Sequence, residues 1–189
     1  MKSLFRSISQ FPEYKNMEPM WIDNEIVHRH ILWPTCGDTM QNVVEEDCPR
    51  KGYIRDLSFI DCLAMDKYAP RKHLAQGQKT GDVVIGVATT MQNGKLRCSQ
   101  LQIVEVRLNY KNGKNVSYSE LKNKISGTLA FLGRDIPVSQ DYWFLFTDKV
   151  ASIAEWALNR SIYATKDTKQ KKYYKIIRLS DFKSSLNFV

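Results

Sequence analysis

Two candidate strands joined by Asn93-Gly94 constrain the fold of this chain more strongly than any other feature of the sequence. Residues 83–91 are dense in β-branched side chains, and residues 96–110 form a longer segment in which apolar and polar side chains are interspersed. β-Branched residues favour extended backbone, and Asn-Gly tolerates the positive φ angles that a tight hairpin turn requires. The sequence therefore predicts an antiparallel hairpin at the centre of a sheet.

Further strands and helices are predicted on both sides of this hairpin. Before it, residues 57–65 form an apolar run, and a loop with several Lys and Arg residues follows over 66–81. After it, Ser117 and Glu120 have the spacing of a capping box, and apolar residues recur at helical spacing from there to Gly133. From residue 57 the predicted order is β-β-β-α-β-α-β, in which the last strands cover 141–147 and 173–179 and the last helix is marked by Val150, Ile153, Ala154, Ala157 and Leu158.

This order predicts an α+β (or α/β) fold with a mixed sheet flanked by helices. The chain has 189 residues, of which 43% are hydrophobic and 25% charged. Such a composition is typical of one compact globular domain and excludes a collagen-like or wholly disordered chain. Residues 1–56 show no comparable pattern. We expect an N-terminal extension or cap there, and a core over 57–189 that ends in a basic segment.

The sequence also carries expectations about compartment. No run approaches the about 18 consecutive apolar residues of a membrane-spanning helix, and the first residues lack the uninterrupted apolar segment of a secretory signal. The 4 cysteines stand at irregular spacing, which predicts no disulfide framework. We therefore expect a cytoplasmic protein that does not associate with membranes.

The formal net charge of +8 is distributed unevenly along the chain. Residues 1–60 hold 7 basic and 9 acidic side chains, whereas residues 61–189 hold 21 and 11, and residues 160–189 alone hold 8 and 2. A basic half attracts polyanions, nucleic acid above all. A solvated surface whose charge serves solubility is the alternative explanation.

Charged side chains interrupt the second strand of the hairpin. Because side chains alternate along a strand, Glu105 and Arg107 project to one face, while Val104 and its neighbours at alternate positions project to the other. Asp82 stands at the start of the paired strand, so the hairpin brings two carboxylates near one another. Such a pair can share a hard cation such as Mg²⁺ or Mn²⁺. The alternatives are an ion-pair ladder on a solvated face and an aspartate that only ends a turn.

These residues carry a resemblance to a known family. Gly-Asp82-Val-Val-Ile, a hairpin, and then Ile103-Val104-Glu105-Val106-Arg107 resemble the PD-(D/E)XK nuclease superfamily, which has the restriction endonuclease-like fold. The resemblance covers residues 57–147. It implies that Asp82 and Glu105 bind Mg²⁺ or Mn²⁺, and that Arg107 stands in the active site at the position of the superfamily's lysine.

The sequence departs from the superfamily's pattern at two positions. Gly81 replaces a proline, and Arg107 replaces the lysine. An arginine stabilises negative charge but stays protonated, so it cannot shuttle a proton. Lys79, or else Lys122 or Lys124 on the following helix, is a candidate to take the place of the lysine.

Three further groups of residues are candidates for binding. Asp61, inside an apolar run, is an additional metal ligand candidate, or else a hydrogen-bonded polar group of the core. Lys171, Lys172 and Tyr173 combine positive charge with an aromatic ring, and with Lys79 and Lys122 we predict that they bind nucleic acid. A lysine-rich turn that protects an edge strand is the alternative for 166–172. The spacing of His28, His30, Cys36 and Cys48 fits no zinc knuckle, which favours buried cysteines and surface histidines.

Taken together, these features predict a metal-dependent nuclease that acts on nucleic-acid phosphodiesters. The alternative is a catalytically inactive relative that serves as a nucleic-acid- or protein-binding subunit, alone or as a homodimer. A third reading is an immunity-type protein that binds an acidic partner. The identity of residue 107 discriminates between the first two, since restoring lysine there is expected to raise cleavage only if a metal site exists. Binding that survives loss of both carboxylates and follows acidic protein rather than nucleic acid would favour the third.

Overall fold

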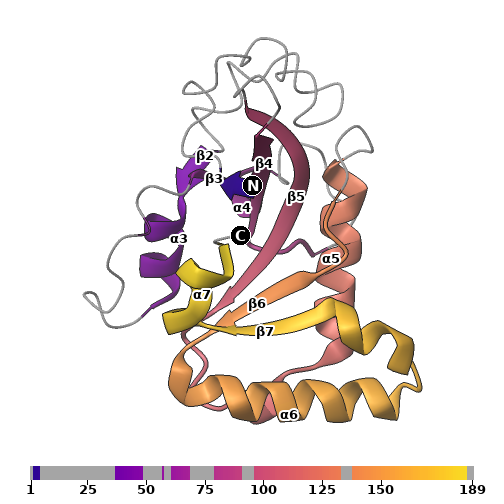
Figure 1. Ribbon diagram of the computed structural model, residues 1–189. Helices are drawn as coiled ribbons and strands as arrows, with labels where there is room; N and C mark the ends of the chain where they lie inside the picture. Colours follow the sequence, from indigo (N-terminus) through magenta and orange to yellow (C-terminus); the bar gives the residue numbers. More distant parts are fainter. Residues whose placement is uncertain are drawn as a thin grey trace.

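The computed structural model describes residues 2–4, 37–48, 57, 61–68, 79–90, 96–132 and 138–186. In these residues, one mixed sheet forms the centre of the fold (Figure 1). The sheet order is β2-β3-β4-β5-β6-β7, and β1 pairs with β4. The strands are β1 (Lys2–Leu4), β2 (Gly37–Thr39), β3 (Asp61–Ala64), β4 (Val83–Thr90), β5 (Leu96–Arg107), β6 (Tyr142–Phe146) and β7 (Tyr174–Arg178).

Helices cover both faces of this sheet. The α-helices are α3 (Met40–Asp47), α4 (Met65–Tyr68), α5 (Tyr118–Leu132), α6 (Asp148–Ala164) and α7 (Leu179–Leu186), and the 3₁₀ helices are η5 (Gly113–Asn115) and η6 (Thr168–Tyr173). None of the helices in the described ranges is both long and apolar enough to cross a lipid bilayer.

Strand direction changes in the middle of the sheet. From β2 to β5, neighbouring strands are antiparallel, whereas β5, β6 and β7 are parallel to one another. Parallel neighbours require crossover connections, and α5 and α6 provide them. The predicted order β-β-β-α-β-α-β and the mixed sheet are therefore confirmed, because they correspond to β3, β4, β5, α5, β6, α6 and β7.

The two faces of β5 belong to two separate hydrophobic clusters. Leu101 and Ile103 pack in the cluster that contains α5 and α6. Val104 and Val106 pack in the other cluster, with α3 and α7. Figure 1 shows α5 and α6 along the right and bottom of the fold and α3 and α7 at its left. The alternation predicted for this strand is thus confirmed, and Glu105 faces the α5 side.

Some predicted boundaries differ from the structure. The predicted first strand starts at Asp61 in the described residues, and the loop predicted after it contains α4. β5 ends at Arg107 rather than at 110. The turn predicted at Asn93-Gly94 and the helix end at Gly133 lie outside the described residues. The described part of residues 1–56 pairs with the sheet through β1 and β2 and packs α3 against it.

The start of α5 is held by tertiary contacts rather than by the predicted capping box. The backbone N–H of Tyr118 donates to Ser161 Oγ of α6 at 3.0 Å. The Ser117 hydroxyl lies 2.9 Å from that of Ser119, and Glu120 turns toward Arg107. A helix start satisfies its N–H groups with whichever acceptor lies nearest, and here α6 supplies it.

Candidate functional site

The strand register brings the two predicted carboxylates together. Val83 pairs with Val104 in the antiparallel β4–β5 ladder. Asp82, just before Val83, and Glu105, just after Val104, therefore stand opposite one another at the end of that ladder. Asp82 Oδ2 accepts a hydrogen bond from Val106 N at 2.7 Å, which fixes the aspartate against β5. The negative charge of Asp82 contributes to a raised pKa of Glu105, as expected for two carboxylates that share one site.

Arg107 bridges three carboxylates in this cluster. Its guanidinium is ion-paired with Glu105, lies 3.8 Å from Asp82 Oδ2 and lies 3.5 Å from Glu120 Oε1. The guanidinium carbon also stands 5.7 Å from the ring centre of Tyr110. The planar guanidinium presents five N–H donors in a fixed fork, so its separate nitrogens can face different carboxylates. Arg107 is therefore integrated into the cluster.

Of the three candidate lysines, Lys124 is the one that reaches the carboxylates. Its ammonium is paired with Glu105 Oε1 and lies 3.5 Å from Asp82 Oδ1. Lys122 turns away and lies 2.9 Å from Asp167 Oδ2. Lys79 is exposed just before β4 and makes no ion pair with either carboxylate. A lysine ammonium therefore stands in the cluster, supplied by α5 instead of β5.

Glu105 is the least solvated charge of the cluster. The residue is 0% exposed, and Oε2 has no hydrogen-bond partner in the described part of the chain. Burial, and to a smaller extent the charge of Asp82, raise the pKa of Glu105 to about 8, although Arg107 and Lys124 act in the opposite direction. A buried carboxylate oxygen without a partner is costly, so this atom can accept a further cationic or hydrogen-bonding group.

The donor set fits a hard divalent cation bound at an open site. Asp82 is 30% exposed on its side chain, so this carboxylate can be reached from solvent, whereas Glu105 lies buried behind it. Mg²⁺ is commonly held by one or two carboxylates and completes its shell with waters and a substrate phosphate. In the described ranges no group of three or more His, Cys, Asp or Glu residues is placed to hold a metal ion.

Asp47 is a member of this region that the sequence did not single out. Its Oδ2 accepts hydrogen bonds from Leu108 N and, at 3.2 Å, from Asn109 N, just beyond β5. Burial is the main cause of a raised pKa of Asp82, and the charge of Asp47 adds to it. The sequence did contain one signal for a role of Asp47. Glu45, Glu46 and Asp47 end α3, where negative charge is unfavourable to the helix dipole and therefore needs a partner elsewhere.

The backbone N–H of Gly81 is used in a hydrogen bond that joins the start of β4 to α5. Gly81 N donates to Thr128 Oγ1 at 2.7 Å, and Thr128 Oγ1 donates to Lys124 O at 2.9 Å. A proline has no N–H to donate. A Cβ on Gly81 would also stand 3.3 Å from Ile103 Cγ2 and 3.6 Å from Glu105 Oε2. The start of β4 is thus fastened to the turn of α5 that carries Lys124.

The remaining predicted residues lie elsewhere. Asp61 is the first residue of β3, and Met65, four residues later, donates its backbone N–H to Asp82 O. Four residues of extended strand span about 13 Å. Asp61 therefore lies at the other end of β3 from Asp82.

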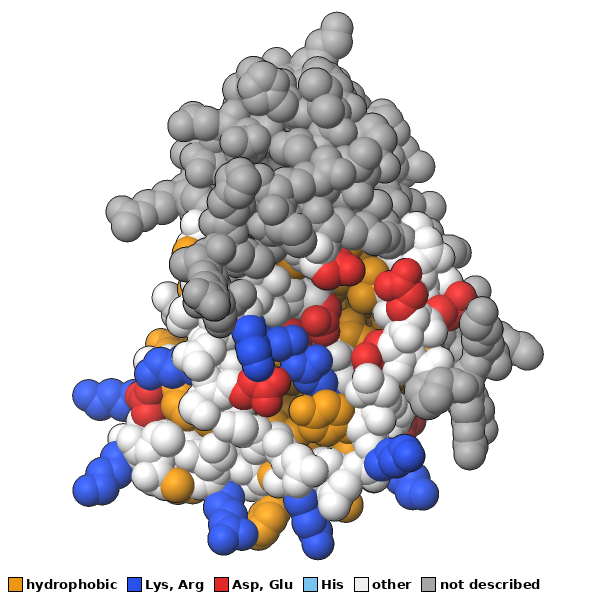
Figure 2. Space-filling model, turned by 180° about the vertical axis from the view of Figure 1, so that it is seen from behind, with side chains coloured by type: hydrophobic (Ala, Val, Ile, Leu, Met, Phe, Trp, Pro, Cys, Tyr) orange, Lys and Arg blue, Asp and Glu red, His pale blue; other side chains and the backbone are white. Residues whose placement is uncertain are grey.

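Three of the residues predicted to bind nucleic acid, Lys171, Lys172 and Tyr173, lie in η6, which contributes none of the ion pairs that the structure describes in the carboxylate cluster. Of the zinc candidates, only Cys48 lies in the described residues, at the end of α3. In the view from behind, acidic and basic side chains lie next to one another in the middle of the molecule, beside an apolar area, and more lysines and arginines project from its lower margin (Figure 2).

Comparison of the chain with protein-family models, with curated proteins and with solved structures gave no match.

Proposed function

We propose that the chain is a metal-dependent nuclease of the PD-(D/E)XK type, in which Asp82 and Glu105 hold Mg²⁺ or Mn²⁺. The observation that carries this proposal is the buried Glu105 Oε2, which has no partner in the described residues and lies beside a second carboxylate. The element order from β3 to β6 supports it, since it is the order of that superfamily's core.

The electrostatics of the cluster favour a bound cation. Three carboxylates, Asp82, Glu105 and Glu120, face two cations, Arg107 and Lys124. Burial, and to a smaller extent the charge of Asp82, raise the pKa of Glu105 to about 8, so ionising this carboxyl is costly without a further cation. A divalent cation would stabilise the ionised form of Glu105 and give Oε2 a partner.

The chain's own residues have separate tasks in this proposal. When bound, the metal ion supplies polarisation of a phosphoryl oxygen and a lowered pKa of water. Asp82 and Glu105 orient it. Arg107 stays protonated and stabilises the negative charge that develops on the phosphate. Lys124, beside Asp82, holds the phosphate or the attacking water.

Cleavage of plasmid, single-stranded DNA and RNA tests the proposal. The folded chain is incubated with Mg²⁺ or Mn²⁺, or with a chelator, beside Asp82→Asn and Glu105→Gln. The exposed Asp141→Asn variant is the matched control. We expect metal-dependent cleavage that both site variants reduce by at least about 100-fold and that the control retains. No cleavage by the folded wild type, or cleavage that the site variants retain, would reject the catalytic role.

Metal binding has a readout that needs no catalysis. A ligand that binds only the folded state raises its stability, by about 2.7 kcal/mol at 100 times the dissociation constant. We expect Mn²⁺ or Mg²⁺ to raise the melting temperature of the wild type, and to leave that of Glu105→Gln unchanged. Equal shifts in both proteins would show that the ion binds elsewhere.

One observation favours a second candidate function, an inactive relative that binds nucleic acid or protein. Arg107 and Lys124 both pair with Glu105, so the cluster already compensates much of its own charge. In that case Asp82→Asn and Glu105→Gln would change stability without affecting binding of nucleic acid, and no metal-induced shift would be seen.

A further inference from the structure

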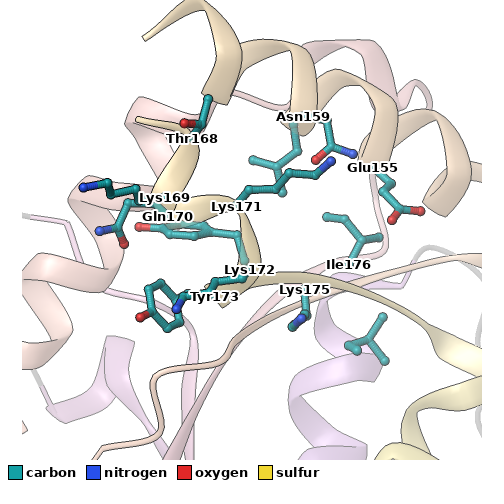
Figure 3. A pocket seen from close by; sticks show the side chains of 13 residues that line it. Glu155, Asn159, Thr168, Lys169, Gln170, Lys171, Lys172, Tyr173, Lys175 and Ile176 are labelled. Carbon is teal, nitrogen blue, oxygen red and sulfur yellow. The ribbon is translucent and has the colours of Figure 1, made fainter. Parts of the chain in front are cut away.

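A groove runs between α6 and the segment formed by η6 and the start of β7. Its volume is about 900 Å³, and its walls come from residues 168–177 and from one side of α6, including Leu158 and Asn159. Figure 3 shows the side chain of Lys171 extending across this groove toward Asn159 and Glu155 of α6. The groove is separate from the carboxylate cluster, since it shares no lining residue with it.

The groove is strongly basic. Lys169, Lys171, Lys172 and Lys175 line it and are exposed, and Glu155 is the one acidic residue of the lining. The nearby Asp167 does not offset this charge, because its carboxylate is taken by Lys122 and by the hydroxyl of Tyr118. Such a concentration of positive charge attracts a chain of phosphates.

Aromatic rings accompany the cations. Lys172 Nζ stands 4.8 Å from the ring centre of Tyr173, and Lys171 Nζ stands 5.5 Å from that of Tyr163. Tyr163 is 58% exposed and Trp156, at 5.4 Å from Arg160, is 57% exposed. Trp156 and Tyr163 are seven residues apart on α6, so they lie on the same side of the helix, beside the groove rather than in its lining. Tyr173 belongs to the lining and lies near Lys172, and the ring of Tyr163 lies near Lys171. A ligand that extends from the groove along α6 would meet these rings together with the lysines.

We infer that this groove and the adjoining exposed side of α6 bind single-stranded nucleic acid, with phosphates on the lysines and unpaired bases stacked on the rings. Stacking on exposed aromatic side chains requires bases that are not enclosed in a duplex. An acidic protein would use the positive charge but not the exposed ring faces. The inference rests on the proposed function in taking the ligand to be a nucleic acid, and it names the strandedness of that substrate.

Binding without metal separates this inference from catalysis. Fluorescence anisotropy of a labelled oligothymidine and of a duplex of equal length is measured in chelator over a range of salt concentrations. Lys171→Gln/Lys172→Gln is compared with Lys111→Gln/Lys114→Gln, which removes the same charge from exposed positions around η5. For the single strand, we expect the groove variant to reduce the magnitude of the slope of log affinity against log salt concentration by about 1.4, or about 0.7 for each lysine removed. We expect the control variant to have the same slope as the wild type.

A second variant tests the rings. Trp156→Leu/Tyr163→Leu is expected to weaken the single strand by at least about five-fold and to leave duplex binding unchanged, whereas Ile153→Ala on the same helix face changes neither. Circular dichroism verifies that each variant is folded.

Three results would overturn the inference: a groove variant that behaves like its control, ring variants that affect the duplex equally, or competition by polyglutamate as strong as by oligothymidine. The last would point to an acidic protein partner. If cleavage is observed but one of these three results is also obtained, the proposed nuclease stands and the inference about the groove is rejected. If the groove binds the single strand as expected but no cleavage is observed, the inference stands and the proposed nuclease is rejected.

Discussion

Gly81 and Thr128, 47 residues apart in the chain, are joined by a 2.7 Å hydrogen bond from Gly81 N to Thr128 Oγ1. The same hydroxyl donates to Lys124 O at 2.9 Å. The residue before Asp82 and the helical turn that carries Lys124 are therefore held by one buried side chain. Through this contact the strand and the helix present their charged groups to the same space.

Replacement of Thr128 by valine should weaken the link between β4 and α5. The two side chains have nearly the same shape, but valine cannot accept from the buried Gly81 N–H. We expect the free energy of unfolding to fall by about 1–3 kcal/mol, the cost of an unpaired buried donor. Urea denaturation measures it. Thr128→Ser should retain most of the stability, and a valine variant as stable as wild type would mean that the bond contributes nothing.

Arg107→Lys is expected to lower cleavage and stability rather than to raise them. Lys124 already supplies an ammonium to Glu105, and a lysine at 107 could not bridge Asp82 and Glu120 at the same time. We expect a loss of about 1.5–3 kcal/mol in unfolding free energy, comparable with one charged hydrogen bond. Chemical denaturation and a cleavage assay check both effects. Faster cleavage by Arg107→Lys would show that the strand position needs the lysine after all.

The carboxylate pair could be predicted from the sequence because it depends on local rules. A hairpin and the alternation of side chains along β5 suffice to set Asp82 against Glu105. The choice of Lys124 over Lys122 could not be made in this way. Two residues turn a helix by about 200°, so the two lysines face opposite sides, and only the packing of α5 decides which side meets the sheet.

Contacts distant in sequence were beyond prediction for the same reason. Asp47 meets the N–H groups after β5 across 61 residues, and no local pattern encodes that pairing. The predicted capping box of Ser117 and Glu120 does not form, because both ends of it have tertiary partners. Ser161 accepts from the backbone N–H of Tyr118, and Arg107 pairs with Glu120. Patterns of strand and helix periodicity thus gave the element order, while side-chain partners followed from packing.

Stability at alkaline pH should depend on Tyr118. Burial and the hydrogen bond that its hydroxyl donates to Asp167 at 2.6 Å raise the pKa of Tyr118 to about 12. Because the folded pKa exceeds the ordinary value of 10.0, the contribution is present below pH 10 and is lost as pH rises toward 12.

Melting temperatures between pH 8 and pH 12 test this. Tyr118→Phe should have a shallower decline over that range than the wild type. A part of the decline remains in the variant, because burial also raises the pKa of Tyr174. Identical profiles in the two proteins would contradict the role of Tyr118.

Gly113→Ala should destabilise the contact between η5 and α6. A Cβ at this position would stand 2.5 Å from Ala154 N and 2.9 Å from Val150 O, both backbone atoms that cannot move aside cheaply. We expect a loss of about 1–3 kcal/mol, the usual cost of overpacking. The neighbouring exposed Lys114→Ala is the control in thermal denaturation, and an unchanged Gly113→Ala would refute the close approach.

The single-turnover rate of nucleic-acid cleavage by Lys124→Ala tests the central claim most directly. The claim is that α5 supplies the lysine of a metal-dependent site formed by Asp82 and Glu105. Lys149→Ala, an exposed lysine on α6, is the matched control. We predict metal-dependent cleavage by the wild type and the control, and a rate at least about 100-fold lower for Lys124→Ala. Equal rates for the two variants, or no cleavage by the folded wild type, would contradict the claim.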